Sequence, residues 1–202
     1  MIGIYGGSFD PVHLGHLGTA IAIKNELNLE KCLMMPCATP AHKAGLHYSD
    51  SERLDILNLA IQDYSELEID KREIARGGDS FTIDTLKECR QESPDKTLCL
   101  IIGMDSFMQF KSWKCWQEFT NFVHLIVLAR PNYKADNHSL TSFHTTSDKK
   151  HLTKQQHGLL YFAECPLIDV SSSEIRGKIA ANKNLDDFLP KTIINYIKNN
   201  DT

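Results

Sequence analysis

The sequence predicts an α/β protein, built as a doubly wound parallel sheet with helices on both faces. Two observations lead to this class. Short apolar runs recur along the chain, and the longer segments between them carry apolar residues at helical spacing. The final part of the chain reads as helix, so we also expect a C-terminal helical portion over residues 171–202.

Strands are predicted where apolar residues run together over a few positions. Parallel strands that are buried on both faces have this appearance, and each run here is separated from the next by enough chain for a crossover. The predicted strands are Ile2 to Tyr5, Cys32 to Met35, Leu67 to Ile69, Leu98 to Ile102 and His124 to Leu128, with a weaker sixth over Leu159 to Phe162.

Helices are predicted between these strands and after the last of them. Gly15 to Leu29 carries apolar residues at largely helical intervals. Asp50 to Tyr64 does the same and has a candidate N-terminal cap at Ser49 or Asp50. The remaining predicted helices are Thr82 to Arg90, Trp113 to Phe122, Ser173 to Ala181 and Pro190 to Asn199.

One polar stretch, residues 132–158, interrupts the alternation with Asn, Ser, Thr, Lys and His. We expect it to form a long surface excursion, whose role the sequence leaves open. A strand-like run and two helices follow it, so it does not read as a linker between domains. We therefore predict a single domain over residues 1–202.

Composition narrows the class of protein. With 202 residues, of which 42% are hydrophobic and 24% charged, the chain is long enough for a buried core and unlike collagen, coiled-coil or wholly disordered sequences. Lys and Arg number 22 against 26 Asp and Glu, and the formal charge of -4 argues against a protein that coats nucleic acid.

The cysteines and the N-terminus indicate an intracellular setting. No C-x-x-C pair occurs among the six cysteines, so we interpret them as reduced core residues. No stretch approaches the ~20 apolar residues of a membrane span, and the chain begins directly with the first strand. We predict a cytoplasmic protein with no membrane partner, and homo-oligomerisation stays open. The cysteines are Cys32, Cys37, Cys89, Cys99, Cys115 and Cys165.

The first candidate site is Gly6-Gly7-Ser8-Phe9-Asp10-Pro11-Val12-His13-Leu14-Gly15-His16, between the first strand and the first helix. Ligands of open α/β sheets bind at this position, where a helix N-terminus attracts anions and glycines admit close backbone approach. The spacing matches neither the dinucleotide fingerprint nor a P-loop. His13 and His16 share one helix face, which also fits structural histidines or two metal ligands that lack a third.

With its surroundings, H-x-G-H resembles the signature of the nucleotidyltransferase superfamily, which transfers a nucleotidyl group from a nucleoside triphosphate. The resemblance implies a Rossmann-like nucleotidyltransferase fold. It also implies that both imidazoles hydrogen-bond phosphate oxygens, where preorganised donors stabilise developing charge. The residues so implied in ATP binding are Gly6, Gly7, Ser8, Phe9, His13 and His16.

The second candidate site is Val170-Ser171-Ser172-Ser173-Glu174-Ile175-Arg176. Ser171 and Glu174 read as a capping box, which accounts for two residues without any function. Three consecutive hydroxyls with an arginine in the first helical turn also offer several donors to one polyanion. The stretch resembles the second superfamily motif, which grips the β and γ phosphates, and the resemblance assigns Ser171, Ser172 and Arg176 to ATP.

The third candidate site, Thr39-Pro40-Ala41-His42-Lys43, follows the second strand. A His-Lys pair in a polar loop is usually just solvated. The loop is nevertheless similar to the Pro-Pro-His-Lys/Arg segment of bacterial nicotinate mononucleotide adenylyltransferases, with Ala41 in place of the second proline. That resemblance implies that His42 and Lys43 approach the phosphates of ATP.

Two further segments resemble the nicotinate-binding parts of that family. Residues 76–86 are similar to its Pro-Ser-Tyr-Thr-x-x-Thr-Leu segment, with Asp79 and Phe81 replacing Pro and Tyr. Thr82 is predicted to start a helix, and the N–H groups at a helix N-terminus attract a carboxylate such as that on the pyridine ring of nicotinate mononucleotide. The resemblance thus implies that Ser80, Phe81 and Thr82 bind nicotinate mononucleotide.

The other segment runs from Ile101 to Trp116. By resemblance, Trp113 stacks on the nicotinate ring, Asp105 contacts ribose hydroxyls of either substrate, and Gly103 belongs to the ATP site. Lys114 stands where relatives often have Tyr and is assigned to nicotinate mononucleotide through its backbone N–H. Trp116 is expected in the core, and Arg130 is an open candidate for a substrate phosphate.

The whole pattern is similar to the nicotinate-nucleotide adenylyltransferase family. It implies transfer of the adenylyl group of ATP to nicotinate mononucleotide, with Mg²⁺ bound with ATP and no dedicated metal site. The predicted catalytic residues are His13, His16, Lys43 and Arg176. Two alternatives stay open: a sister transferase acting on phosphopantetheine or nicotinamide mononucleotide, and a catalytically silent nucleotide-binding module.

Overall fold

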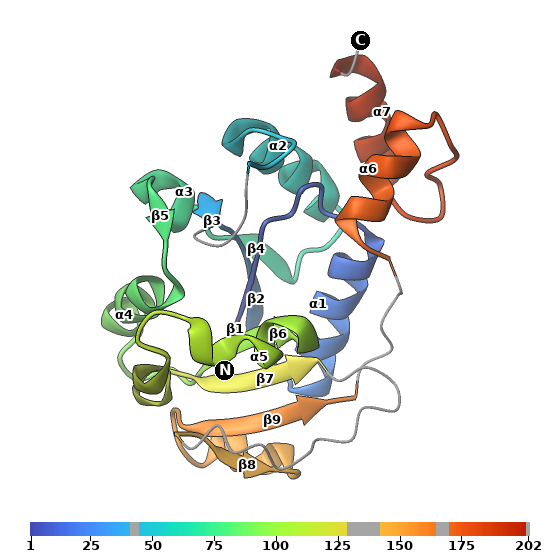
Figure 1. The fold of residues 1–202 in the computed structure, drawn as a ribbon. Coiled ribbons are helices and arrows are strands. Elements are labelled where there is room, and N and C mark those ends of the chain that lie inside the picture. The colour runs from blue at the N-terminus through green and yellow to red at the C-terminus, as the bar shows by residue number, and fades with distance from the viewer. Residues whose placement is uncertain (41–44, 129–141, 165–169, 201–202) are drawn as a thin grey trace.

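The centre of the protein is a parallel sheet. The computed structural model describes residues 1–40, 45–128, 142–164 and 170–200. Within them, seven parallel strands lie side by side in the order β4-β2-β1-β6-β7-β9-β8 (Figure 1). The strands are β1 (Ile2–Gly7), β2 (Lys31–Pro36), β4 (Leu67–Ile69), β6 (Leu98–Gly103), β7 (His124–Leu128), β8 (His144–Thr146) and β9 (Leu159–Ala163). All six predicted strands are confirmed.

The strand order reverses direction between β1 and β6. The chain runs from β1 outward through β2 to β4, and then returns to β6 on the other side of β1 before running outward again. Ile4 pairs with Leu33 of β2 on one side and with Leu100 of β6 on the other. The connections that leave β1 and β6 therefore diverge, and the carboxyl ends of such strands are where ligands of open α/β sheets bind.

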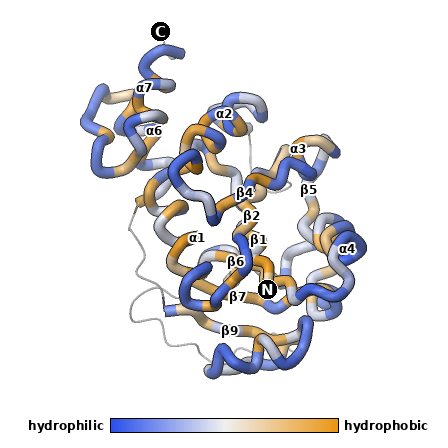
Figure 2. The backbone as a smooth tube through the Cα atoms, turned by 180° about the vertical axis from the view of Figure 1, so that it is seen from behind, coloured by the Kyte–Doolittle hydropathy of each residue, from blue (hydrophilic) through white to orange (hydrophobic). Residues whose placement is uncertain are grey.

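Helices cover both faces of the sheet, as predicted (Figure 1). On one face, apolar side chains of α1, α2, α6 and α7 pack against the sheet in a single cluster. On the other face, α4 and the aromatic residues that follow β6 form a second cluster. The longer helices are α1 (Leu14–Glu26), α2 (Asp50–Ile61), α4 (Thr82–Glu92), α6 (Ser172–Ala180) and α7 (Lys191–Asn200). Figure 2 shows β1 and α1 as largely hydrophobic.

Several short elements were not predicted. Two-residue strands β3 (Thr39–Pro40) and β5 (Asp79–Ser80) pair with each other in parallel outside the main sheet. Strands of this length carry no periodicity that a sequence could reveal. The other short elements are helices α3 (Arg72–Arg76) and α5 (Met104–Met108) and the 3-10 helices η1 (Phe110–Ser112), η2 (Trp116–Asn121) and η3 (Lys149–Thr153).

Two predicted segments are corrected. The predicted helix from Trp113 to Phe122 is not an α-helix, because Cys115 has a left-handed backbone with φ of 53° and only η2 follows it. The predicted surface excursion, residues 132–158, is in its described part also the edge of the fold. It supplies β8 and η3, and the side chains of Phe143 and Leu152 are buried.

Other local expectations have mixed outcomes. Ser49 caps α2 in a full capping box with Glu52, and α4 begins at Thr82 as predicted. The five described cysteines form no disulfide, but Cys115 is exposed and Cys37 is half-buried, so these two are not core residues. Trp116 is half-buried at the edge of the second cluster rather than inside it. Cys165 lies outside the described residues.

No helix in the described parts of the chain is both long and apolar enough to cross a membrane. That the chain forms one domain stays a prediction. In its support, Ile193 of α7 and Leu17 of α1 belong to the same buried cluster.

A buried histidine ties the polar excursion to the sheet. His124 opens β7 and is fully buried. Its Nδ1 accepts a hydrogen bond from Leu159 N (3.1 Å), and its Nε2 lies 3.2 Å from Leu152 O and 3.0 Å from Gln155 O. The proton must therefore sit on Nε2, where it faces two carbonyl oxygens. Burial is the main cause that lowers the pKa of His124.

Replacing His124 with Gln should destabilise the protein in a pH-dependent way. At neutral pH we expect a loss of about 1–3 kcal/mol from the broken buried hydrogen bonds. The folded-state pKa lies below the unfolded value of 6.5, so the unfolded chain takes up the proton first as pH falls. The stability that His124 contributes is thus fully present above 6.5 and declines below it.

Urea unfolding of the wild type and His124→Gln at several pH values checks this prediction. The difference in free energy of unfolding should shrink as the pH falls below 6.5. A difference that stays constant with pH would contradict the assignment. His151→Gln is the matched control, because His151 lies in the polar excursion that His124 ties to the sheet but is exposed, and it should change stability by less than about 0.5 kcal/mol.

Candidate active site

The loop after β1 folds tightly over its own aromatic ring. Phe9 has a positive φ of 46° and its side chain is only 1% exposed. A Cβ on Gly7 would lie 3.1 Å from that ring, so glycine permits the close approach. Because the Phe9 ring is part of the core, its predicted contact with ATP is restricted to the backbone. Gly6 and Ser8 lie beside it at the carboxyl end of β1.

His13 begins α1 as its N-terminal cap. Its Nδ1 accepts a hydrogen bond from His16 N (3.3 Å), which leaves the proton on Nε2. The side chain is 4% exposed, and burial lowers its pKa to about 4. His13 is therefore a neutral hydrogen-bond donor at neutral pH. An arriving polyanion favours the protonated form and raises the pKa again.

His16 stacks on His13, so the two predicted imidazoles form one unit. The ring centroids are 3.7 Å apart with an interplanar angle of 26°. Phe9 meets the His16 ring edge-on at 5.1 Å, and the Tyr5 ring lies 6.2 Å away. These aromatic neighbours orient the pair at the N-terminus of α1.

The second motif packs directly onto the first. Ser172 Oγ donates to Pro11 O (3.0 Å), and Arg176 Nη1 donates to Asp10 O (2.6 Å). A Cβ on Gly15 would lie only 2.8 Å from Val170 Cγ1, so the glycine of H-x-G-H admits the chain that leads into α6. The structure thus brings His13, His16, Ser172 and Arg176 together from opposite ends of the sequence.

The side chain of Asp10 connects the first motif to the residues before α2 and to α6. Its carboxylate is almost fully buried and accepts hydrogen bonds from His47 N (3.0 Å) and Tyr48 N (2.9 Å). Arg176 Nη1 lies 3.3 Å from the same carboxylate. The sequence analysis gave this side chain no role, although its position inside the first motif was a signal.

Ser171 caps α6, so one half of the predicted capping box is present. Its Oγ accepts from Glu174 N (3.1 Å), while the carboxylate of Glu174 pairs with Lys178 (3.4 Å). Arg176 Nη2 donates to Ser173 Oγ (3.0 Å). The cap uses a lone pair of the Ser171 hydroxyl and leaves its O–H free to donate, so capping is compatible with phosphate binding.

The third motif is joined to the predicted nicotinate segment. Thr39 pairs with Asp79 and Pro40 with Ser80 through the small β3–β5 sheet. Ala38 N donates to Ser80 Oγ (3.1 Å), so the Ser80 side chain holds the loop after β2. The predicted residues His42, Lys43 and Arg130 lie outside the described residues.

Two of the predicted nicotinate residues, Lys114 and Phe81, meet at the N-terminus of α4. Lys114 Nζ lies 4.2 Å from the centroid of the Phe81 ring and 3.3 Å from Asp84 Oδ2. Phe81 is the N-terminal cap residue of α4, and its side chain makes no capping hydrogen bond to the helix that Thr82 begins. Trp113 is half-buried against Phe110, with ring centroids 5.3 Å apart.

Gly103 and Asp105 lie at the carboxyl end of β6. Gly103 ends β6, next to β1, and caps α5. A Cβ at Gly103 would meet nothing within 4 Å, so the space beside it is open. Asp105 is exposed in the first turn of α5. Both residues are therefore at the carboxyl edge where the first motif lies.

Comparison with known proteins identifies the family. The cytidylyltransferase-like family matches residues 4–178. A probable nicotinate-nucleotide adenylyltransferase of Vesicomyosocius okutanii is 43% identical over 98% of this chain and 93% of its own length. Another from Psychromonas ingrahamii is 38% identical over 98% of this chain and 94% of its own. The chain belongs to the nicotinate-nucleotide adenylyltransferase family.

Solved structures agree in fold. The nicotinic acid mononucleotide adenylyltransferase of Plasmodium falciparum, in complex with NaAD, superposes with a TM-score of 0.74 at 21% identity and covers 98% of this chain and 94% of its own. A putative nicotinate-nucleotide adenylyltransferase of Vibrio parahaemolyticus gives 0.65 at 17% identity and covers 95% and 94%.

This member of the nicotinate-nucleotide adenylyltransferase family has a site built from hydrogen-bond donors. Among the described residues, no three His, Cys, Asp or Glu side chains come together as metal ligands. The donors around the first loop suit phosphate oxygens, and Mg²⁺ prefers oxygen ligands such as phosphates and water. The residues present therefore fit an ion that arrives with the triphosphate.

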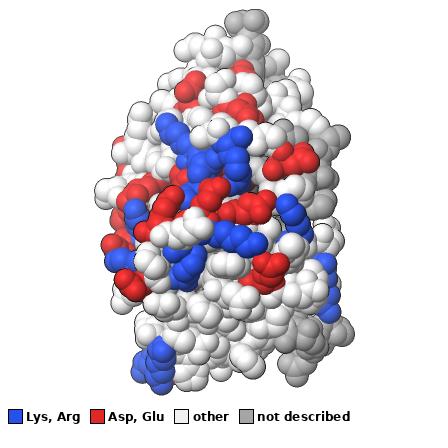
Figure 3. Space-filling view, turned by 90° about the vertical axis from the view of Figure 1, so that its left-hand side faces the viewer, with Lys and Arg blue, Asp and Glu red and all other residues white. Residues whose placement is uncertain are grey.

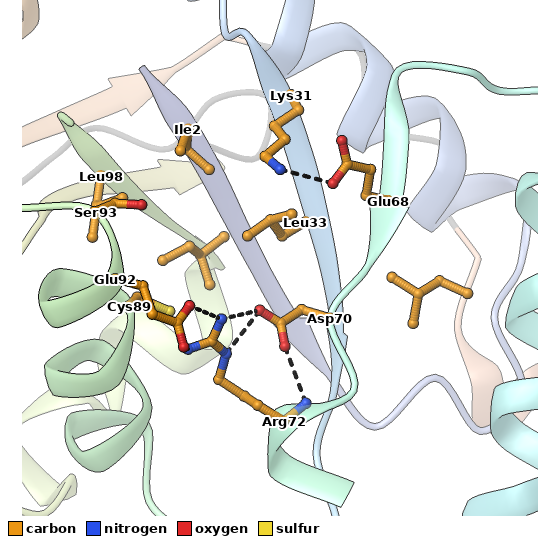
Figure 4. A pocket seen from close by; sticks show the side chains of 12 residues that line it. Ile2, Lys31, Leu33, Glu68, Asp70, Arg72, Cys89, Glu92, Ser93 and Leu98 are labelled. Atoms are coloured by element: carbon orange, nitrogen blue, oxygen red, sulfur yellow. Dashed lines mark hydrogen bonds and ion pairs between the residues drawn. The ribbon is translucent and has the colours of Figure 1, made fainter. Parts of the chain in front are cut away.

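A cavity of about 210 Å³ lies at the opposite ends of the strands, where β1, β2 and β6 begin. Figure 4 shows that its charged side chains pair with one another: Lys31 with Glu68, and Arg72 with Asp70 and Glu92. On the face that carries α3 and α4, acidic and basic groups alternate in the same way (Figure 3). This cavity is thus separate from the carboxyl ends of the strands, where the sequence motifs lie.

The sequence analysis also missed Arg53, a fully buried charge on α2. A signal was present, because Arg53 falls at helical spacing with Ile56, Leu57 and Ala60, the other buried residues of that helix. A charged residue on the apolar face of a helix needs partners.

The ionisation of His13 is directly measurable. In the ligand-free protein its imidazole should titrate with a pKa of about 4, and NMR of the ring resonances measures this. Loss of the signal in His13→Gln assigns it. Addition of a nucleoside triphosphate should raise the pKa, because nearby negative charge favours the protonated ring. A ligand-free pKa near the ordinary 6.5 would contradict the burial of the side chain.

Proposed function

We propose that this protein transfers the adenylyl group of ATP to nicotinate mononucleotide, which gives deamido-NAD and pyrophosphate. The observation that carries the proposal is the junction of the two motifs, where the stacked pair of His13 and His16 meets Ser172 and Arg176. Full-length similarity to nicotinate-nucleotide adenylyltransferases supports the same reaction. It is a step in NAD biosynthesis.

The reaction is a direct in-line displacement. An oxygen of the 5'-phosphate of nicotinate mononucleotide attacks the α-phosphorus of ATP. As the new phosphorus–oxygen bond forms, the bond from the α-phosphorus to the bridging oxygen breaks, and its electron pair leaves with pyrophosphate. The attacking phosphate is already ionised at neutral pH, so catalysis requires alignment and charge stabilisation rather than a nucleophilic side chain.

The protein groups assigned to this task are donors. His13 offers its Nε2 proton to phosphate oxygen, and His16 lies against it in position to do the same. Arg176 and the Ser171 hydroxyl face the leaving phosphates in this assignment, with Lys43 completing the set. The Ser172 hydroxyl joins them only by giving up its hydrogen bond to Pro11 O. Mg²⁺, bound with ATP, supplies further neutralisation of phosphate charge.

The acceptor side of the proposal rests on α4. The first N–H groups of that helix, at Thr82, carry partial positive charge and receive the nicotinate carboxylate. Lys114, stacked over Phe81 at 4.2 Å, brings an ammonium close to this helix end, where it is paired with Asp84 of the first turn. An amide would leave these donors poorly matched, which favours the acid over nicotinamide mononucleotide.

Both partners in this proposal are small molecules, and we infer no nucleic-acid or membrane partner. A cytoplasmic location stays a prediction, and the five described free cysteines are consistent with a reducing compartment. Two other functions remain as alternatives to be tested: transfer to another phosphate such as phosphopantetheine, and ATP binding without turnover.

Pyrophosphate release from MgATP with each candidate acceptor distinguishes these functions. We expect release with nicotinate mononucleotide and much slower release with the amide analogue, because only the acid offers a carboxylate to α4. Faster turnover with phosphopantetheine would assign the protein to a sister activity. ATP binding without release with any acceptor would identify a silent module and overturn the proposal.

His16→Ala should lower turnover by ~10²-fold or more, as the loss of a strong oxyanion donor does. The fold should be retained, because His16 is only half-buried. Steady-state pyrophosphate release measures the effect and circular dichroism checks the fold. His151→Ala, at an exposed histidine in η3, is the control and should keep normal turnover. Near-normal turnover in His16→Ala would refute the assignment.

A further inference from the structure

The most deeply buried charge among the described residues belongs to Arg53 of α2, whose exposed fraction is 0%. The other buried residues of this helix are Ile56, Leu57 and Ala60, which pack in the core. The guanidinium of Arg53 instead reaches the loops that follow β1 and β2. Its printed side-chain hydrogen bonds are to backbone carbonyls and to the Asp50 carboxylate.

The guanidinium donates to the backbone of both loops at once. Arg53 Nη1 donates to Ser8 O (2.7 Å), in the first phosphate motif. Arg53 Nη2 donates to Cys37 O (2.6 Å) and to Ala38 O (3.3 Å), in the loop after β2. Cys37 N also donates to Gly7 O (3.0 Å), so the two loops are bonded to each other beside the arginine.

Burying the Arg53 guanidinium costs free energy of desolvation, which its ion pair only partly offsets. Its single acidic partner among the described residues, Asp50 at 2.7 Å, has a half-exposed side chain and cannot neutralise it fully. The Arg53 Nε is buried and finds no hydrogen-bond partner in the described part of the chain. Apolar residues often replace buried ions without loss of stability. What the arginine supplies specifically is a fixed direction for several backbone carbonyls.

The peptide plane turns that direction into a constraint on the active site. In a trans peptide, the C=O of one residue and the N–H of the next point in opposite directions. Because the Cys37 carbonyl points at Arg53, the Ala38 N–H points away from it and donates to Ser80 Oγ (3.1 Å). The Ser8 carbonyl likewise turns the Phe9 N–H away from the arginine, within the loop proposed to bind ATP.

We propose that Arg53 is a positioning residue. It fixes the loop after β1, which is proposed to bind ATP, relative to the segment around Ser80, which is proposed to bind nicotinate mononucleotide. It acts through the Ser8 peptide on one side, and on the other through the Cys37 peptide and the Ser80 hydroxyl. The proposal deepens the adenylyl transfer proposed above and rests on it. In-line transfer needs both substrates held in one geometry, and a misplacement of about 1 Å costs on the order of 10²-fold in rate.

Arg53→Lys and Arg53→Met test the proposal. Lysine keeps the charge but cannot bond both loops in the planar geometry of guanidinium. We expect kcat/KM to fall by about 10²-fold, with KM raised for ATP and for nicotinate mononucleotide together. The matched control is Arg90→Met, because Arg90 also donates to backbone carbonyls, those of Ser93, Pro94, Lys96 and Phe122, but at the far end of α4. It should change thermal stability and leave both KM values unchanged.

Two further measurements separate positioning from general stability. Amide hydrogen exchange should show loss of protection at Ala38 in the Arg53 variants and not in Arg90→Met. Ser80→Ala, alone and with Arg53→Lys, should be non-additive in KM for nicotinate mononucleotide, since both residues act through one peptide. Arg53→Met is the harsher variant, so if it does not fold, Arg53→Lys decides.

Failure of the proposed function and failure of the positioning role give different results. A wild type that releases no pyrophosphate with ATP and nicotinate mononucleotide refutes the proposed function, and the exchange of Ala38 still tests the role of Arg53. If the wild type is active, folded Arg53→Lys with both KM values within about twofold of wild type refutes the positioning role. Additive effects of Arg53→Lys and Ser80→Ala would refute it as well.

Discussion

The buried carboxylate of Asp10 is the interaction on which the arrangement of the site depends. A buried carboxylate is stable only when its oxygens accept hydrogen bonds. Its donors come from Tyr48 and His47, just before α2, and from Arg176 of α6. Arg176 also donates to the backbone carbonyl of Asp10 (2.6 Å), so the same residue ties α6 to the loop after β1 and places the second phosphate motif against the first. The sheet thus sets where the first motif lies, and the contacts of Asp10 hold the second motif beside it.

The same logic explains how a chain with a formal charge of -4 can hold a triphosphate. Net charge governs long-range attraction, whereas a site depends on donors in fixed places. His13 illustrates the difference, because its burial keeps it neutral and its proton is nevertheless aimed by the bond from His16 N. Helix N-termini, one guanidinium and Lys43 complete the proposed set, so few cations are required.

Departures from the family pattern are accommodated by contacts within the chain. Phe81 stands in the place of the more usual Tyr and lacks its hydroxyl, and Lys114 also stands where relatives often have Tyr. In the structure the two are partners, since the Lys114 ammonium lies over the Phe81 ring and against Asp84. An aromatic face attracts a cation and covers its stem. The two replacements thus form one contact at the end of α4.

The sequence by itself determined the strands, the longer helices, the place of each motif and the family, because these depend on local periodicity and short patterns such as H-x-G-H. It did not determine the β3–β5 pair, the fold of the polar excursion around His124, or the roles of Asp10 and Arg53. Arg176 and Asp10 are 166 residues apart, and the acceptors of Arg53 are mainly backbone carbonyls. Every residue carries such a carbonyl, so only the tertiary structure decides which ones a buried charge selects.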